Sequence, residues 1–193
     1  TAPAAALADA NGLEVVQSGV SKGAVMSQVK TYMFASLVDI SGASAGQIKF
    51  PATQNPSANV NTLDDYEEGT YTPGISFGGA SVGITYTTAL GSYTKIGDRV
   101  LFTERIVLSN KGSSVGTALI TGRPFANEAN IGAVFAICAP SGFTGLTAGL
   151  VGQNTVSATT ATIRIPNTTG TTSAADTNFS NTSTFNAAGV YQV

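Results

Sequence analysis

Histidine and tryptophan are both absent from this chain of 193 residues, and cysteine occurs only once. Without histidine the chain lacks the usual general base at neutral pH, the serine–histidine–aspartate triad and the commonest metal ligand. A single cysteine rules out a disulfide within the chain, and with no histidine beside it a zinc site is not expected. The sequence also lacks the glycine-rich phosphate loops of nucleotide-binding proteins. We therefore expect no metal and no cofactor.

Charge is scarce as well. Charged residues make up 10% of the chain, whereas typical soluble domains have about 25%. Between residues 131 and 193 the only charges are Arg164 and Asp176. A monomer with so uncharged a surface risks self-association, so one interpretation is that other copies of the chain cover much of it.

Two classes of partner are not expected. The net charge of −2 offers no positive footprint for nucleic acid. No apolar run reaches the roughly 18 residues that a membrane-spanning helix needs, so we expect no membrane insertion. The single cysteine, Cys138, ends the apolar run 131–138, which predicts a buried and inert thiol.

The residues that are abundant favour strands. From Thr70 onward, β-branched and aromatic residues recur in short runs that turn residues separate, as is typical of an all-β fold. The expected strands are 82–90, 99–108, 116–121, 131–138, 145–153, 161–165 and 189–193. So many short strands predict a mainly β, antiparallel head over 74–193, a sandwich or jelly-roll-like fold.

The segment 1–49 has a different pattern, and we interpret it as a stalk. A short strand is expected at Leu13–Gln17, and a short helix over about 22–37. Within that helix Met26, Val29 and Met33 follow a heptad spacing. The helix either packs on its own domain or joins a parallel bundle of identical helices. Because the chain begins with Thr1 rather than Met, we expect further sequence ahead of it.

An acidic stretch lies between these two parts. Residues 64–68 contain four of the 11 acidic residues, and prolines at 51, 56 and 73 bracket them. Those prolines argue against a continuous helix, so 50–73 is expected to be an irregular connection. The acids could form a structural joint, bind an ion such as calcium, or supply the carboxylate pair of a glycosidase.

Several loop residues are candidates for contacting a sugar. Sugar sites combine an aromatic face with a few polar side chains. The loops of the predicted head offer such residues, although an ordinary loop role is the usual one for residues of these types. The candidates are Asn127, Glu128, Asn130, Phe143, Asn167 and Asp176.

Three pieces of the sequence resemble tail fibres of bacteriophages. Residues 48–73, with Asn61-Thr-Leu-Asp-Asp-Tyr-Glu-Glu-Gly-Thr-Tyr-Thr-Pro73 at their end, resemble a segment of fibres and related tail proteins. Residues 93–100 and 122–125 resemble the domain that follows it. The family pattern has Leu at the position of Arg123, so we expect Arg123 to be exposed or to pair with an acid. The narrower resemblance is to contractile-tailed phages of Acinetobacter.

This resemblance implies a parallel homotrimer at the distal end of a tail fibre in the virion. It also implies binding to a host surface glycan, capsule or lipopolysaccharide, and attachment to other tail or baseplate proteins through the missing N-terminal part. Avidity at equivalent tips needs no catalytic group, so we expect no enzyme activity. The alternatives are a capsule depolymerase that uses carboxylates and a purely structural fibre or adaptor.

Overall fold

The computed structural model describes residues 13–17, 20–24, 50–53, 57–59 and 61–193. They fall into two compact units, 1–55 and 56–193. The first unit contains strands β1 (Leu13–Gln17) and β2 (Val20–Ala24), which pair antiparallel. The strand expected at Leu13–Gln17 is therefore confirmed.

The helix expected over about 22–37 is wrong at its beginning, because residues 22–24 belong to strand β2. There the backbone pairs with β1, as in the register Glu14↔Gly23. A short isolated helix would be marginal in water, whereas a hairpin gives these backbone groups partners along the chain. The predicted seam of Met26, Val29 and Met33 lies outside the described residues.

The second unit is one antiparallel sheet of ten strands in the order β3-β5-β6-β12-β8-β9-β10-β7-β4, with β11 paired to β10. A 3-10 turn, η1 (Asp176–Asn178), precedes the last strand. The strands are β3 (Tyr66–Tyr71), β4 (Gly74–Phe77), β5 (Ile84–Ile96), β6 (Arg99–Lys111), β7 (Ala118–Thr121), β8 (Val134–Phe143), β9 (Leu150–Asn154), β10 (Ala161–Asn167), β11 (Gly170–Ser173) and β12 (Phe179–Gln192).

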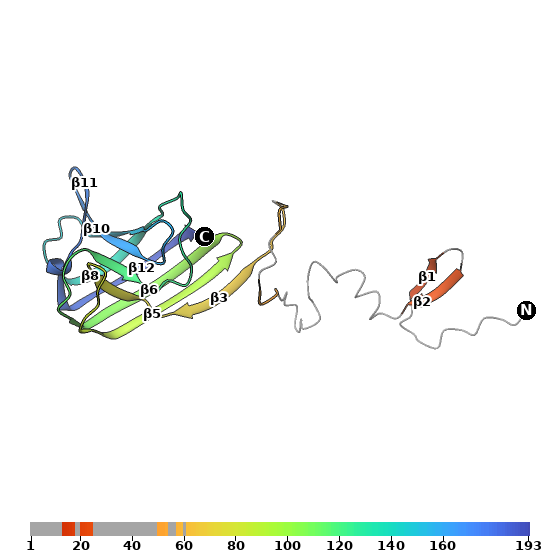
Figure 1. Ribbon diagram of the computed structural model, residues 1–193, viewed down its shortest axis with the longest axis horizontal. Coiled ribbons are helices and arrows are strands. Elements are labelled where there is room, and N and C mark those ends of the chain that lie inside the picture. Colours follow the sequence, from red (N-terminus) through yellow and green to blue (C-terminus); the bar gives the residue numbers. More distant parts are fainter. Residues whose placement is uncertain (1–12, 18–19, 25–49, 54–56, 60) are drawn as a thin grey trace, which may run out of the picture. The chain divides into compact units, whose positions relative to one another are not determined.

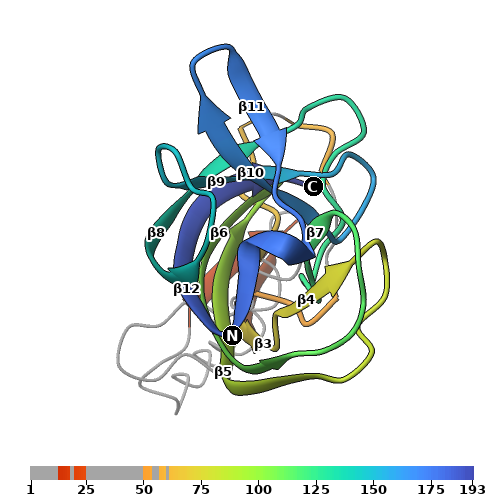
Figure 2. The ribbon, with the colours of Figure 1, turned by 90° about the vertical axis from the view of Figure 1, so that its left-hand side faces the viewer.

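The sheet curls into a half-barrel. Strands β3 and β4 stand at opposite ends of the strand order, yet only Thr72 and Pro73 separate them in the chain. The two edges of the sheet must therefore come near each other, and Figure 2 shows the strands arranged around a common interior. The prediction of a mainly β, antiparallel fold is confirmed. The two stacked sheets of a sandwich or jelly roll are replaced by one curled sheet.

A glycine makes room for the bend between β3 and β4. Gly122 has φ +83°, and a Cβ there would lie 2.5 Å from the carbonyl oxygen of Thr72. A larger residue would strain this backbone and collide with the bend. Pro73, in the bend itself, is among the most buried side chains of the domain.

The alternation of strand β6 shows how the core forms. In β6 the buried residues Val100, Phe102, Ile106 and Leu108 alternate with exposed or half-buried ones. Such alternation is typical of an antiparallel sheet with one covered face. The same alternation corrects the prediction for Cys138, because Phe135 and Ile137 of β8 face the core while Cys138 faces outward and is exposed.

Two tyrosine–glycine pairs fix strand β3 on β5. Gly69 lies opposite Tyr93, and Tyr71 lies opposite Gly91. A Cβ added to Gly69 or Gly91 would lie 2.5 Å from an atom of the opposing tyrosine side chain. Each ring therefore occupies the space above a glycine, and a shift of register by one residue would remove both contacts.

Candidate functional site

The strands of the β domain run between two ends. One end holds the beginning of β3 and the turn at Gly97 between β5 and β6, and the C-terminus lies there too, because Val193 donates a backbone hydrogen bond to Asp98. The other end collects the connections β4–β5, β6–β7, β8–β9, β10–β11 and β11–β12, and we call it the loop end (Figure 1). It consists of residues 78–83, 112–117, 144–149, 168–169 and 174–178.

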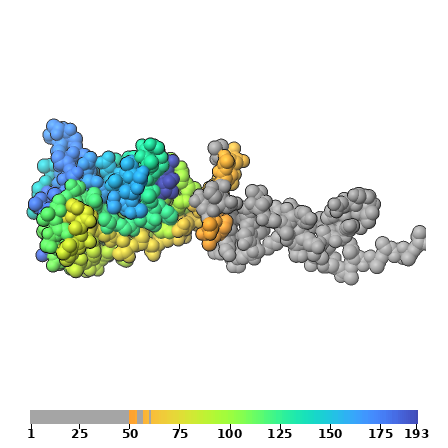
Figure 3. Space-filling model, viewed as in Figure 1, coloured from red at the N-terminus to blue at the C-terminus, as the bar shows by residue number. Residues whose placement is uncertain are grey.

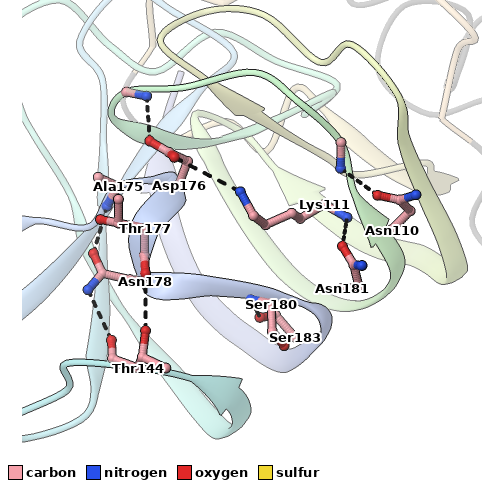
Figure 4. Close-up of polar contacts among 12 residues, drawn as sticks. Asn110, Lys111, Thr144, Ala175, Asp176, Thr177, Asn178, Ser180, Asn181 and Ser183 are labelled. Carbon is pink, nitrogen blue, oxygen red and sulfur yellow. Dashed lines mark hydrogen bonds and ion pairs between the residues drawn. The ribbon is translucent and has the colours of Figure 1, made fainter.

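Asp176 and Lys111 hold two of these loops together (Figure 4). Asp176 accepts a backbone hydrogen bond of 2.8 Å from Gly116. Its other carboxylate oxygen lies 4.0 Å from Nζ of Lys111. The Lys111 backbone in turn donates to the side chain of Asn181, at 3.0 Å. The β6–β7 loop is thus tied to η1 and to the beginning of β12.

Asn178 ties the β8–β9 loop to the same turn. Its side-chain amide donates to the carbonyl oxygen of Thr144, and its backbone carbonyl accepts from the Thr144 amide, both at 3.0 Å. The Thr144 hydroxyl completes the link by donating to the carbonyl of Thr177. These bonds form a preorganised set of loops rather than a group of independent ones.

The exposed surface of the loop end carries almost no charge. Asp176 is the only charged residue in the five loops of this end. Lys111, which immediately precedes the loop 112–117, is the only charge that flanks them closely, and it faces Asp176. Two large apolar side chains are well exposed, Val82 at 64% and Val115 at 70%. The Thr-rich hairpin β10–β11 projects from the body of the domain (Figure 3). Such a surface suits a neutral polar ligand better than an ionic one.

The structure divides the predicted sugar-binding residues between the two ends. Asn127, Glu128 and Asn130 lie at the end away from the loop end, since the Glu128 amide donates to Gln192. Asn127 is 3% exposed, and its amide nitrogen donates to the carbonyl of Ile131 at 2.6 Å. Glu128 accepts bonds from Asn130. Asn127 thus shapes its loop from within.

The other three candidates lie at the loop end, and each is engaged within the protein. The ring of Phe143 packs edge-on against Phe179, with centroids 4.7 Å apart. Asn167 accepts two hydrogen bonds from Thr169 at the tip of the hairpin. Asp176 holds Gly116 and Lys111. These residues shape the loop end, and the exposed valines and threonines beside them were not singled out by the sequence.

The acidic stretch is built into the sheet rather than into an irregular connection. Asp64 accepts a backbone bond of 2.7 Å from Ser57, and Asp65 forms an ion pair with Lys95 of β5. Glu67 and Glu68 lie within β3. The sheet thus begins at Tyr66, inside the expected connection, because the prolines stand outside the strand and leave its backbone free to pair.

Two of these acids accept hydrogen bonds from tyrosines. Tyr93 donates to Glu67 on the inner face, and Tyr66 donates to Glu68 on the outer face. The bond to Glu67, together with burial, raises the pKa of Tyr93 to about 12. The bond to Glu68 raises the pKa of Tyr66. Every carboxylate of the stretch has a protein partner, which is the arrangement of a structural joint.

Arg123 and Glu104 form a second polar group, inside the sheet. They are 5% and 4% exposed, and Nη2 of Arg123 lies 3.0 Å from Oε1 of Glu104. Tyr71 donates to the other oxygen of Glu104 at 2.8 Å, and Asn154 accepts from Arg123. Burial, followed by the charge of Glu104, raises the pKa of Tyr71 far above its usual range. Of the two expectations for Arg123, pairing with an acid is confirmed and exposure is wrong.

Two features are absent from the described part of the chain. No group of three or more His, Cys, Asp or Glu there is arranged to hold a metal ion. Nor does that part include a helix of the length and apolar character needed to cross a bilayer.

The curled sheet is similar in fold to part of a phage tailspike protein. The match is to the crystal structure of the Dettilon tailspike protein (gp208), with a TM-score of 0.57 and 19% sequence identity. It covers 66% of this chain and 24% of the tailspike chain, so the likeness concerns about a quarter of that protein. The sequence itself matches no model of a protein family and no curated protein. The resemblance to phage tail proteins is confirmed by this match at the level of the fold.

Proposed function

We propose that the β domain is the host-recognition end of a phage tail protein, and that it adsorbs to a bacterial surface polysaccharide without cleaving it. The observation that carries the proposal is the loop end, where five connections gather and are cross-linked by hydrogen bonds such as those of Asn178 with Thr144. Its surface is uncharged apart from one acid and one base that face each other. The likeness in fold to a tailspike adds support.

Neutral hydroxyl-rich ligands fit this surface. Exposed threonines and backbone groups offer donors and acceptors, while Val82 and Val115 offer apolar contact. Contacts of this kind are weak singly and gain strength when several equivalent sites act together. We therefore include in the proposal a parallel homotrimer, carried at the distal end of the tail by further tail or baseplate proteins.

The absence of catalysis is also part of the proposal. The acids of the 64–68 stretch that could supply a glycosidase pair already have partners, among them Lys95 for Asp65 and Tyr93 for Glu67. A glycosidase acid needs an apolar pocket that raises its pKa and an open path to the scissile bond. The side chain of Asp65 is largely buried against Lys95, whereas Glu67 is exposed and lies in no apolar pocket.

The test measures binding and cleavage in the same samples. Purified capsules and lipopolysaccharides from a panel of bacterial isolates are mixed with the protein, and both retained protein and released reducing ends are recorded. We expect binding to at least one polymer, no sugar release, and loss of binding in Val115→Glu. Sugar release that Asp64→Asn with Glu67→Gln abolishes would establish the depolymerase instead. A protein that binds no polymer and does not compete with phage adsorption would be a structural component.

A further inference from the structure

The outward face of five neighbouring strands, β3, β5, β6, β12 and β8, is a regular surface of small side chains. Its middle row consists of residues that pair directly across the strands and share one face. All five are exposed. In strand order they are Thr70, Ser92, Thr103, Ala188 and Ala136. We call this surface, with the rows beside it, the outer sheet face.

The neighbouring rows add apolar side chains. On one side Leu101 pairs with Val190, and the two are 44% and 46% exposed. On the other side Leu90, 67% exposed, pairs with Arg105. That second row ends at the exposed Cys138, which pairs with Asn186. Val134, two residues before Ala136 on β8, is 64% exposed.

A shallow hollow of about 840 Å³ lies over four of these strands. Its lining includes short outward side chains, among them Thr70, Ser92 and Ala188, together with the backbone of Gly69 and Gly189 between the rows. The aromatic partners of these glycines, Tyr93 and Phe102, turn toward the core. The outer sheet face is therefore flat to slightly hollow and has no bulky side chain at its centre.

We propose that the outer sheet face is an interface between copies of this chain. Across the three rows the only charges are Glu68 and Arg105, which differ in sign. A neighbouring copy brings the same two charges, so that Glu68 of one copy can meet Arg105 of the next, together with rows of the same small side chains at the same spacing. Sheets pack face to face when such rows interdigitate.

The size of the face agrees with this occupant. Strands β5 and β6 each have 13 residues, which corresponds to roughly 44 Å at about 3.4 Å per residue. Because β3 has only 6 residues and β8 has 10, the five strands together, at about 3.4 Å by 4.8 Å for each residue, present roughly 900 Å² of sheet. A standard protein interface buries about 800 Å² on each partner.

This inference deepens the homotrimer of the proposed function, because it assigns the contact to particular strands. The single thiol gives a direct test. In the intact protein, Cys138 should be protected from a maleimide under native conditions and should react after unfolding in guanidinium. In Leu101→Glu with Val190→Glu, light scattering should show single chains, and Cys138 should become reactive while far-UV circular dichroism keeps its β signal.

Matched controls separate this inference from the others. Val115→Glu changes a valine at the loop end that is more exposed than Val190, at 70% against 46%, and it should leave the assembly and the protection of Cys138 unchanged. Ser113→Cys in a Cys138→Ser background should be labelled freely in the assembly. If Leu101→Glu with Val190→Glu fails to fold, Ser92→Cys in the Cys138→Ser background takes its place. Its reactivity toward the maleimide measures protection at the centre of the face.

Three results would overturn the inference. An assembly in which Cys138 and Ser92→Cys react freely would place the contact elsewhere, and the homotrimer would stand without this face. A single-chain protein with a protected Cys138 would mean that the chain's own residues cover the face. A single-chain protein with a reactive Cys138 would remove both this inference and the homotrimer, while polysaccharide binding at the loop end would still be measured separately.

Discussion

Arg123 donates a hydrogen bond of 3.0 Å from Nη2 to Oε1 of Glu104 inside the curled sheet, where the two side chains are 2% and 0% exposed. The guanidinium carbon also lies 4.0 Å from the centroid of the Phe102 ring and 4.4 Å from that of Phe135. The guanidinium group thus has a carboxylate as its hydrogen-bond partner and lies over two aromatic rings. Each charge is stabilised by the other, because neither side chain is accessible to water.

Arg123→Leu should be strongly destabilising. It restores the residue of the tail-fibre pattern but leaves Glu104 as an uncompensated buried charge, which costs on the order of 3–5 kcal/mol. The free energy of unfolding in urea measures the loss. Combining Arg123→Leu with Glu104→Gln should cost less than the sum of the single changes. The matched control is Arg99→Leu, since the pair of Arg99 and Asp98 is 56% and 54% exposed and such pairs contribute at most about 1 kcal/mol. Equal losses for Arg123 and Arg99 would contradict the prediction.

Gly69→Ala should weaken the attachment of β3. The new methyl group would lie 2.5 Å from the Tyr93 side chain, and overpacking of this kind costs roughly 1–3 kcal/mol. Gly132→Ala is the control, because nothing lies closer than 3.9 Å to its Cβ position. Urea unfolding of Gly69→Ala, of Tyr93→Ala and of the double variant gives the coupling energy, with Gly132→Ala measured beside them. A coupling of zero would mean that the ring does not hold the strand.

Stability should fall as the pH rises above about 10, where an unfolded tyrosine ionises. The pKa of Tyr93 is raised to about 12 in the folded protein, so between these values the unfolded state has lost a proton that the folded state keeps. The slope of unfolding free energy against pH is therefore negative there. Tyr93→Phe should reduce this slope, as measured by urea unfolding from about pH 8 to 11.5. An unchanged slope would show that the hydrogen bond to Glu67 does not hold the proton.

Binding to polysaccharide should depend little on salt. The only acid and base of the loop end, Asp176 and Lys111, face each other and leave no net charge for a ligand to meet. Raising the ionic strength from about 0.05 to 0.5 M shortens the screening length several-fold, yet the dissociation constant should stay within about threefold. Titration calorimetry on a bound polymer from the panel measures this. A steep loss of affinity would instead indicate an anionic polymer held by another surface.

Local pattern was enough to find most of the strands. Runs such as 99–108 and 161–165 are dense in β-branched residues, and they lie within β6 and β10. Strand β3 was missed because its glutamates resemble a solvated turn, whereas Glu67 turns inward to meet Tyr93. The curl of the sheet depends on which distant strands pair, such as β4 with β7, and no local pattern carries that information.

The buried pair of Glu104 and Arg123 could be inferred from the sequence. In the run 99–108, Glu104 is in phase with Val100, Phe102 and Ile106, so alternation places it on the covered face. A buried acid requires a partner. Arg123 is an arginine where the tail-fibre pattern has leucine, and it supplies that partner. The loop end could not be found in this way, because its parts come from connections far apart in the sequence. Asn178 and Thr144, for example, meet only in the folded domain.

The course of strand β3 has a mechanical consequence. The strand begins at Tyr66, at the end away from the loops, and runs toward the loop end beside β5. A pull on the chain ahead of Tyr66 against a held loop end therefore acts along the strand. The backbone bonds between β3 and β5 lie across that direction. They share the load together rather than parting one after another, which is the geometry of a tether that must hold under tension.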